Sequence, residues 1–500
     1  MSKSSINTIQ TLGQLKESTY RSKSVKEELR DNLIDALKSG KTLFKGIQGY
    51  EDTVIPQLET AILSRHNILL LGLRGQAKTK MARLMVHLLD EYIPVVAGSE
   101  INDDPYKPLS KYAIDLIAEK GDDTPITWLH RSDRYVEKLA TPDVSVADLI
   151  GDLDPIKAAS QKLTYADERV IHFGLVPRSH RCIFVINELP DLQARIQVAL
   201  FNILQEGDIQ IRGFRLRLPL DIQFVFTANP EDYTNRGSIV TPLKDRIGSQ
   251  ILTHYPKSVE TSSLITSQEA SLMEDQKKSI VVPELIRRLI EQVAFEARKS
   301  EYIDQKSGVS ARLTISAFES LHSVIQRRML ISGEKNSTAR ISDLYGIIPA
   351  ITGKVELVYE GEIEGISNVA YNLIGKAIRS EFLRHFPDPE KMKRSKKKNP
   401  YQEILNWFNN GNHIDFLHVA SGKLHLEELK KVEGLKNVVS DYCKQTPAEE
   451  HALYMEFLLH GLSEFSQISK KKLEQEIRFS DLVGSIFSSD IDDEDFNQDN

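Results

Sequence analysis

Short apolar runs alternate with helical patterns between residues 46 and 255. The runs have strand length, and their sequences are ILLL (68–71), PVV (94–96), CIFVIN (182–187) and IQFVFTAN (222–229). Strands separated by helices indicate a parallel sheet that is covered by helices on both faces. The pattern predicts an α/β domain.

The segments on either side of this domain have a helical texture. KEELRDNLIDALKSG ends at Gly40, a plausible helix stop, and VPELIRRLIEQVAFEAR is amphipathic. The linker-like KRSKKKNP precedes further helical sequence, and the acidic end is almost free of apolar residues. We therefore expect an N-terminal helical segment (1–45), the α/β domain (46–257), an all-α lid (258–375), a helical C-terminal extension (376–487) and an acidic disordered tail (488–500).

A glycine-containing loop follows the first apolar run. GLRGQAKT, residues 72–79, lies between ILLL and the helical KMARLMVHLLDEY, which is the strand, loop, helix order of a P-loop. The pattern predicts ATP as ligand, with Lys78 on the outer phosphates and the Thr79 hydroxyl on Mg²⁺. A chance turn between a strand and a helix is the alternative. The expected ATP-binding residues are Gly72, Leu73, Arg74, Gly75, Gln76, Ala77, Lys78, Thr79 and Lys80.

One position of the loop departs from the usual pattern. Ala77 stands where a glycine normally precedes the lysine. We expect Ala77 to enter the helix with a negative φ, where a Cβ costs little.

The apolar run 182–186 is followed by two polar residues that suit a metal and water site. Asn187 occupies the position where an aspartate usually organises Mg²⁺, and Glu188 the position of the base that polarises water. The Asn187 oxygen can accept a hydrogen bond from metal-bound water, but the amide brings no negative charge. The missing charge is compatible with slower ATP hydrolysis or weaker Mg²⁺ binding. A polar strand end without catalytic function is the alternative.

Three further residues are candidates for catalysis. Asn229 ends the next apolar run, where an amide can bind the γ-phosphate or the attacking water. Arg246, in PLKDRIGSQI, suits an arginine finger that acts on a neighbouring subunit, and Arg312, in GVSARLTISAFESL, suits contact with the γ-phosphate from the lid. Either arginine could instead form an ordinary surface ion pair.

Composition limits the class of protein. The 500 residues with 40% hydrophobic content suffice for two or more domains, and neither a signal peptide nor an apolar run of membrane-spanning length is present, so we expect a cytoplasmic protein without a membrane partner. Two cysteines form no disulfide framework, and His130, His172 and His180 lack ligand spacing, so we expect no metal beyond Mg²⁺.

The charge balance bears on nucleic acid as a partner. The net charge of −7 argues against a protein that coats nucleic acid. Apolar and polar residues alternate around 209–218, which predicts a β-hairpin. Its Arg212, Arg215 and Arg217 could line the pore of a ring. A DNA-acting ring motor therefore stays a minority alternative.

The ordered motifs resemble a known family. GLRGQAKT, FVINEL, FTANP, KDRIG and GVSARLT occur in the order found in the MoxR and magnesium-chelatase clade of AAA+ ATPases, and ADLIGDLDPIKAA followed by FGLVPRSHRCIFVINELPDL is similar to the chelatase ATPase subunit. The resemblance covers about residues 46–375. Asn187, Arg74 and residues 376–500 depart from the family pattern.

The resemblance implies a homo-oligomer, commonly a hexameric ring, with ATP at the subunit interfaces. It also implies a partner protein with a von Willebrand factor A domain. The sequence as a whole predicts a Mg²⁺-dependent ATPase of the AAA+ class that remodels or metal-loads a partner protein. A nucleotide-gated binding scaffold with little turnover is the main alternative.

Overall fold

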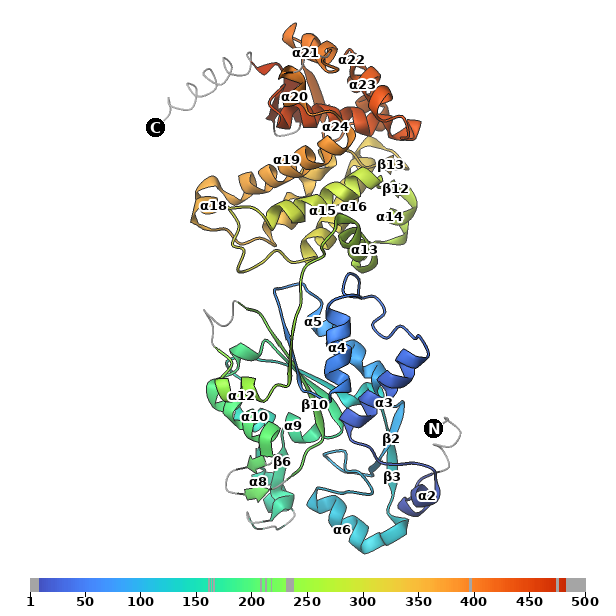
Figure 1. Cartoon of the computed structure of the whole chain (residues 1–500), viewed down its shortest axis with the longest axis vertical. Helices are drawn as coiled ribbons and strands as arrows, with labels where there is room; N and C mark the ends of the chain where they lie inside the picture. The colour runs from blue at the N-terminus through green and yellow to red at the C-terminus, as the bar shows by residue number, and fades with distance from the viewer. Residues whose placement is uncertain are drawn as a thin grey trace. The chain divides into compact units, whose positions relative to one another are not determined.

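The computed structural model describes residues 9–160, 162, 164, 167–206, 209–211, 214–216, 218–230, 238–394, 398–473 and 476–482. The chain divides into two compact units, Met1–Tyr255 and Pro256–Asn500 (Figure 1). The predicted tail, 488–500, and Arg212 and Arg217 of the predicted hairpin lie outside the described residues.

A five-stranded parallel sheet forms the centre of the first unit. Its strand order is β11-β1-β10-β7-β4. The strands are β1 (Ile68–Leu71), β4 (Tyr135–Leu139), β7 (Cys182–Asn187), β10 (Ile222–Ala228) and β11 (Ser249–Leu252). The parallel α/β fold that the sequence predicts is confirmed.

Successive residues of the central strands enter two different cores. Ile68 and Leu70 pack with helices α3 (Val25–Lys38), α4 (Val54–Leu63) and α5 (Lys78–Leu84). Leu69 packs in the second core, with residues of α10 (Ala194–Glu206) and of the short helices α7 (Val146–Leu149), α9 (Leu175–Arg178) and α12 (Thr241–Asp245). Because side chains alternate along a strand, both faces of the sheet are buried, which explains the continuous apolar runs.

The remaining strands of the first unit form small antiparallel pairs outside the central sheet. The predicted strand at PVV lies in β2 (Tyr92–Val96), which pairs antiparallel with β3 (Ile126–His130) instead of joining the central sheet. The predicted hairpin is β8 (Ile209–Ile211) with β9 (Phe214–Leu216). The other elements are α2 (Leu12–Glu17), α6 (Lys111–Lys120), α8 (Pro155–Ser160), and the antiparallel pair of β5 (Gly151–Leu153) with β6 (Ile171–Phe173).

The sequence did not reveal the two strands at the edges of the central sheet. β4 has the sequence YVEKL and β11 has SQIL, so each carries polar side chains among its apolar ones. An edge strand is covered less completely than a central strand, and most residues of β4 are only partly buried. Pairing with β7 and β1, rather than a local apolar pattern, makes these segments strands.

The second unit is built around one continuous hydrophobic core. Its helices are α13 (Val259–Glu269), α14 (Glu274–Ser279), α15 (Glu284–Ala297), α16 (Arg312–Ser332), α17 (Ile348–Thr352), α18 (Tyr359–Glu364), α19 (Ile366–His385), α20 (Pro389–Arg394), α21 (Gln402–Asn409), α22 (Gly422–Lys431), α23 (Leu435–Tyr442) and α24 (His451–Glu464). The core extends from Ile280 to Phe479, and α19 runs through the boundary proposed at 375/376. Among the described residues, no helix combines the length and the apolar character needed to cross a bilayer.

The second unit also contains strands that the sequence did not predict. β12 (Ile280–Val281) pairs with β13 (Ser337–Thr338), and β14 (Ile414–Leu417), β16 (Glu476–Ser480) and β15 (Ser469–Lys472) form an antiparallel sheet in that order. β15 has the sequence SKKK, which carries no apolar alternation. Its strand conformation therefore depends on its hydrogen bonds with β16.

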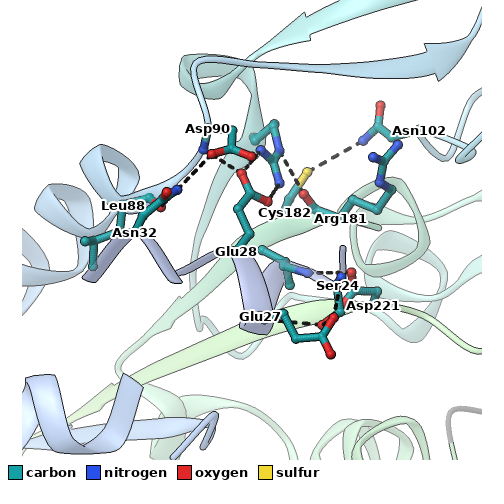
Figure 2. A network of polar contacts seen from close by, with 12 residues as sticks. Ser24, Glu27, Glu28, Asn32, Leu88, Asp90, Asn102, Arg181, Cys182 and Asp221 are labelled. Atoms are coloured by element: carbon teal, nitrogen blue, oxygen red, sulfur yellow. Dashed lines mark hydrogen bonds and ion pairs between the residues drawn. The ribbon is translucent and has the colours of Figure 1, made fainter. Parts of the chain in front are cut away.

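A buried polar network attaches α3 to the sheet of the first unit (Figure 2). Both Arg134 Nη atoms donate to the Glu28 carboxylate at 2.6 Å, and Arg134 Nε donates to the Arg181 carbonyl at 2.9 Å. The Val25 amide, at the start of α3, donates to the Asp221 carboxylate at 2.7 Å. Removing one partner of the fully buried Glu28–Arg134 pair should cost about 3 to 5 kcal/mol, because the other charge would lose its partner.

Asp221 should make the stability of the first unit depend on pH. Burial raises the pKa of Asp221 to about 6, although the Val25 amide and the Arg181 charge oppose the shift. A carboxyl group whose pKa is raised on folding stabilises the native state below its unfolded pKa and loses that contribution as pH rises through about 6. Asp221→Asn retains an oxygen for the Val25 amide but cannot ionise. As pH rises from 4 to 7, the unfolding free energy of Asp221→Asn should increase relative to that of the parent, by up to about 3 kcal/mol.

The measurement is urea unfolding in a Trp407→Phe background, so that fluorescence reports Trp128 of the first unit. Asp52→Asn, at an exposed position, is the matched control. Burial lowers the pKa of His180, whose ring accepts the Asp221 amide N–H, to about 4. The parent and Asp221→Asn share the titration of His180, so its contribution cancels in the difference between their unfolding free energies. A difference that stays constant with pH would contradict the assigned role of Asp221.

Candidate nucleotide-binding site

The predicted P-loop joins the interior strand β1 to the first turn of α5. Gly72 follows β1, and a Cβ on this residue would collide with the side chains of Thr253 and Gln76. Gly75 has a φ of 73°, in the left-handed region that glycine adopts without steric cost. The two glycines therefore allow the loop to turn tightly beside the strand end.

The expected conformation of Ala77 is wrong. Ala77 has a φ of 56° and a ψ of 16°, and the left-handed conformation costs a residue with a Cβ about 1 to 2 kcal/mol. Ala77 is the cap residue before α5. The Tyr50 hydroxyl donates to the Gln76 carbonyl at 3.0 Å and so helps hold the turn.

Lys78 is buried within the loop. Its Nζ donates to the Gly72 carbonyl, to the Leu73 carbonyl at 2.9 Å and to Asn229 Oδ1 at 2.8 Å. Asn229 directly follows β10, the strand beside β1. The structure thus brings together two residues that are 151 positions apart in the sequence.

Asn229 continues the contact to Glu188. Asn229 Nδ2 donates to Glu188 Oε2 at 2.9 Å. Glu188 follows β7 with a φ of 58°, and its backbone N–H donates to the Thr227 hydroxyl at 3.2 Å. A hydrogen-bonded path therefore runs from Lys78 through Asn229 to Glu188 across three adjacent strands.

Asn187 and Thr79 form a second contact at the same edge of the sheet. The Thr79 hydroxyl donates to Asn187 Oδ1 at 3.2 Å, and the Thr227 hydroxyl donates to the same oxygen at 3.0 Å. Asn187 Nδ2 donates to Glu137 Oε1 at 2.8 Å. These partners orient the buried amide with its oxygen toward the P-loop threonine.

Glu137 is a site residue that the sequence analysis missed. It lies on β4, beside β7, and binds Arg83 of α5 at 2.9 and 3.1 Å. Burial would raise the pKa of the Glu137 carboxyl, but hydrogen bonds from Arg83, Tyr135 and Asn187 and the Arg83 charge hold it below its usual value. Glu137 is thus ionised one strand away from Asn187. No local motif marks it, because only the sheet order brings β4 to β7.

The other predicted site residues make contacts outside the hydrogen-bonded path from Lys78 to Glu188. The Arg74 carbonyl accepts from the Tyr255 hydroxyl at 2.9 Å, and Lys80 Nζ donates to the Gly46 carbonyl at 3.0 Å. Arg246 is 40% exposed, forms an ion pair with Asp245 and lies over the Phe201 ring. Arg312 is exposed at the start of α16 in the second unit. Its role toward the nucleotide stays a prediction.

The arrangement defines an α/β fold with a P-loop at the end of an interior strand. The loop follows an interior strand, a polar amide ends the adjacent strand β10, and the acid Glu188 ends β7 beyond it. Lys78, the hydroxyl of Thr79 and the oxygen of Asn187 fit the outer phosphates of ATP and a hydrated Mg²⁺ ion in chemical type. The chemistry of the donor set therefore suits nucleotide with Mg²⁺.

Comparison with known proteins gives similar solved structures at low identity. A complex of the BchI and BchD subunits of magnesium chelatase is 20% identical, with 64% of this chain and 98% of that chain covered and a TM-score of 0.34. A candidate ATPase from Cytophaga hutchinsonii is 17% identical, with 71% and 96% covered and a TM-score of 0.28. The RuvB Holliday junction branch migration motor of Thermotoga maritima is 11% identical, with 73% and 78% covered and a TM-score of 0.32.

No family model matches the chain. At these identities and TM-scores, the functional argument rests on the contacts within this chain.

Proposed function

We propose that this chain binds ATP with Mg²⁺ and hydrolyses ATP as a subunit of a ring-forming AAA+ motor that acts on a partner protein. The path from Lys78 through Asn229 to Glu188 carries the proposal. It places a cation, an amide and a carboxylate at the end of a P-loop strand and its neighbours. These are the groups needed to bind phosphate, orient water and accept a proton.

Lys78 and Asn229 have complementary tasks in this mechanism. Lys78 Nζ donates to loop carbonyls and to Asn229 Oδ1. An anionic phosphate would compete for this ammonium group, since charge-assisted hydrogen bonds are stronger than those to neutral oxygens. Asn229 Oδ1 would then be released to orient the water from which Glu188 accepts a proton. Bound Mg²⁺ would supply positive charge that stabilises the phosphate oxygens.

The neutral Asn187 works together with Glu137 in this proposal. The amide oxygen faces Thr79, and the Glu137 carboxylate accepts from the amide nitrogen. Glu137 thereby polarises and orients Asn187 while its negative charge stays behind the amide. Replacing Asn187 by aspartate would put two carboxylates within hydrogen-bond distance, where like charges oppose simultaneous ionisation.

Arg246 is the residue proposed to connect subunits. Its partial exposure and its pairing with the adjacent Asp245 leave the guanidinium near the surface of the first unit. In a homo-oligomeric ring, Arg246 could reach the ATP that is bound to the next subunit.

The family resemblance further suggests a partner protein with a von Willebrand factor A domain and a cytoplasmic setting.

The first prediction separates nucleotide binding from turnover. Lys78→Ala should weaken ATP binding about 10- to 100-fold, because a charged hydrogen bond contributes about 1.5 to 3 kcal/mol. Glu188→Gln should retain ATP binding and lose about 100-fold or more in turnover, because it removes the base. Binding calorimetry and phosphate release measure the two effects. If the parent releases phosphate no faster than Glu188→Gln, the chain is a nucleotide-gated scaffold instead of a motor.

The second prediction tests the pairing of Asn187 with Glu137. Asn187→Asp alone should lower turnover about tenfold or raise the Mg²⁺ concentration required, because it places two carboxylates together. Adding Glu137→Gln should recover turnover, since one carboxylate then remains. The readout is phosphate release as Mg²⁺ is varied, with Glu137→Gln alone completing the cycle. Additive effects of the two substitutions would argue against the pairing.

The third prediction tests the trans role of Arg246. Arg246→Ala should bind ATP normally and lose about 10³-fold or more in turnover, as expected for an arginine finger. Mixed with Glu188→Gln, it should recover part of the activity, because each Arg246→Ala subunit keeps its base and receives an arginine from its neighbour. Co-assembly of the two proteins is the required control. If mixed assemblies are as inactive as assemblies of either variant alone, Arg246 is the structural partner of Asp245 and not an arginine finger.

A further inference from the structure

The second unit contains a cavity of about 280 Å³ between the β13 segment, the start of α22 and α24. Arg340 and His425 lie in its wall, together with the acidic Glu334, Glu449 and Glu456. The cavity lies entirely within the second unit and shares no residue with the P-loop site. It is therefore a separate candidate site.

Arg340 brings an unpaired donor to this cavity. The side chain is only 6% exposed, its Nη1 donates to the Ala420 carbonyl at 2.9 Å, and its Nη2 has no hydrogen-bond partner. A Cβ built on Gly422 would lie 3.9 Å from Nη2, so this nitrogen faces the start of α22. A buried guanidinium N–H without a partner is costly, and an acceptor in the cavity would remove that cost.

His425 provides a second polar atom beside Arg340. It is 5% exposed, and its Nε2 makes no hydrogen bond, although Glu456 Oε2 lies 3.4 Å away. Glu456 itself is satisfied by the backbone N–H groups of Ile341 and Ser342, each at 2.9 Å. The carboxylate of Glu456 is thus already bound, which leaves the donors of Arg340 and His425 for an external acceptor.

The rest of the lining limits the type of ligand. Glu334, whose Oε1 accepts from the Gly422 N–H at 2.7 Å, and Glu449 add negative charge, while Ala452 and Leu453 add apolar surface. A ligand with anionic groups only would face these two carboxylates, whereas a ligand with only a positive group would leave Arg340 Nη2 unpaired. A small molecule with both charges satisfies both sides.

We propose that this cavity binds a small zwitterion of the α-amino-acid class. Its carboxylate accepts from Arg340 Nη2 and His425 Nε2, and its ammonium group faces Glu334 and Glu449. A volume of about 280 Å³ is sufficient for one amino acid with a side chain of modest size. The site is thus a ligand-binding site in the second unit, in addition to nucleotide binding in the first.

The test is calorimetric titration of the full chain with the standard amino acids, added one at a time up to about 10 mM, a range that detects millimolar affinity. At least one should bind saturably, and its methyl ester and its decarboxylated amine should bind at least about tenfold more weakly, because each lacks the carboxylate. Acetate and inorganic phosphate serve as probes without an amino group. Equal or tighter binding of either would overturn the zwitterion assignment, as would the absence of binding by every amino acid.

Two variants locate the site independently. Arg340→Met removes the donor, and Gly422→Leu adds a side chain to the lining of the cavity, where its Cβ would lie 3.2 Å from Glu334 Oε1. Each should weaken binding at least about tenfold. Gly353→Leu, at an exposed glycine after α17, is the matched control and should bind as the parent does. If Arg340→Met does not fold, Gly422→Leu still decides the question, and unchanged binding in a folded Gly422→Leu variant would exclude this cavity.

Discussion

The parallel pairing of β1, β10 and β7 is the constraint on which the nucleotide site depends. Leu71 at the end of β1 lies opposite Ala228, and Phe226 of the same β10 strand lies opposite Ile186. Because parallel strands end at the same edge of a sheet, the residues that follow each strand meet there. Lys78, Asn229 and Glu188 consequently form a continuous hydrogen-bonded path, although they come from three distant segments.

The same sheet fixes the orientation of the Asn187 amide, which we propose as a ligand for hydrated Mg²⁺. Asn187 donates to Glu137 from β4 and accepts from Thr79 of α5, so its orientation is determined on both sides. Negative charge is present in the site, but it lies one strand away and is shared with Arg83. A second carboxylate at position 187 would disturb this balance. The proposed role of Asn187 is therefore linked to Glu137 through this hydrogen bond.

Two buried polar clusters of this chain have different consequences. In the first unit, the Glu28–Arg134 pair is mutually satisfied and fixes α3 against the sheet. In the second unit, Arg340 has one satisfied and one unsatisfied nitrogen at the wall of a cavity. A satisfied pair contributes to a defined arrangement of helices, whereas an unsatisfied donor beside open volume favours a ligand.

The sequence by itself determined the elements whose signal is local. The apolar runs of β1, β7 and β10 have buried residues on both faces, and the glycines of the P-loop mark the turn into α5, so the α/β fold and the positions of Lys78, Asn187, Glu188 and Asn229 could be predicted. Tertiary structure decided what depends on pairing between distant segments. The edge strand β4 is partly polar, so neither it nor Glu137 has a local signal, and β15 forms only against β16. The left-handed φ of Ala77 likewise had no local signal, since propensity alone favours a helical φ for alanine.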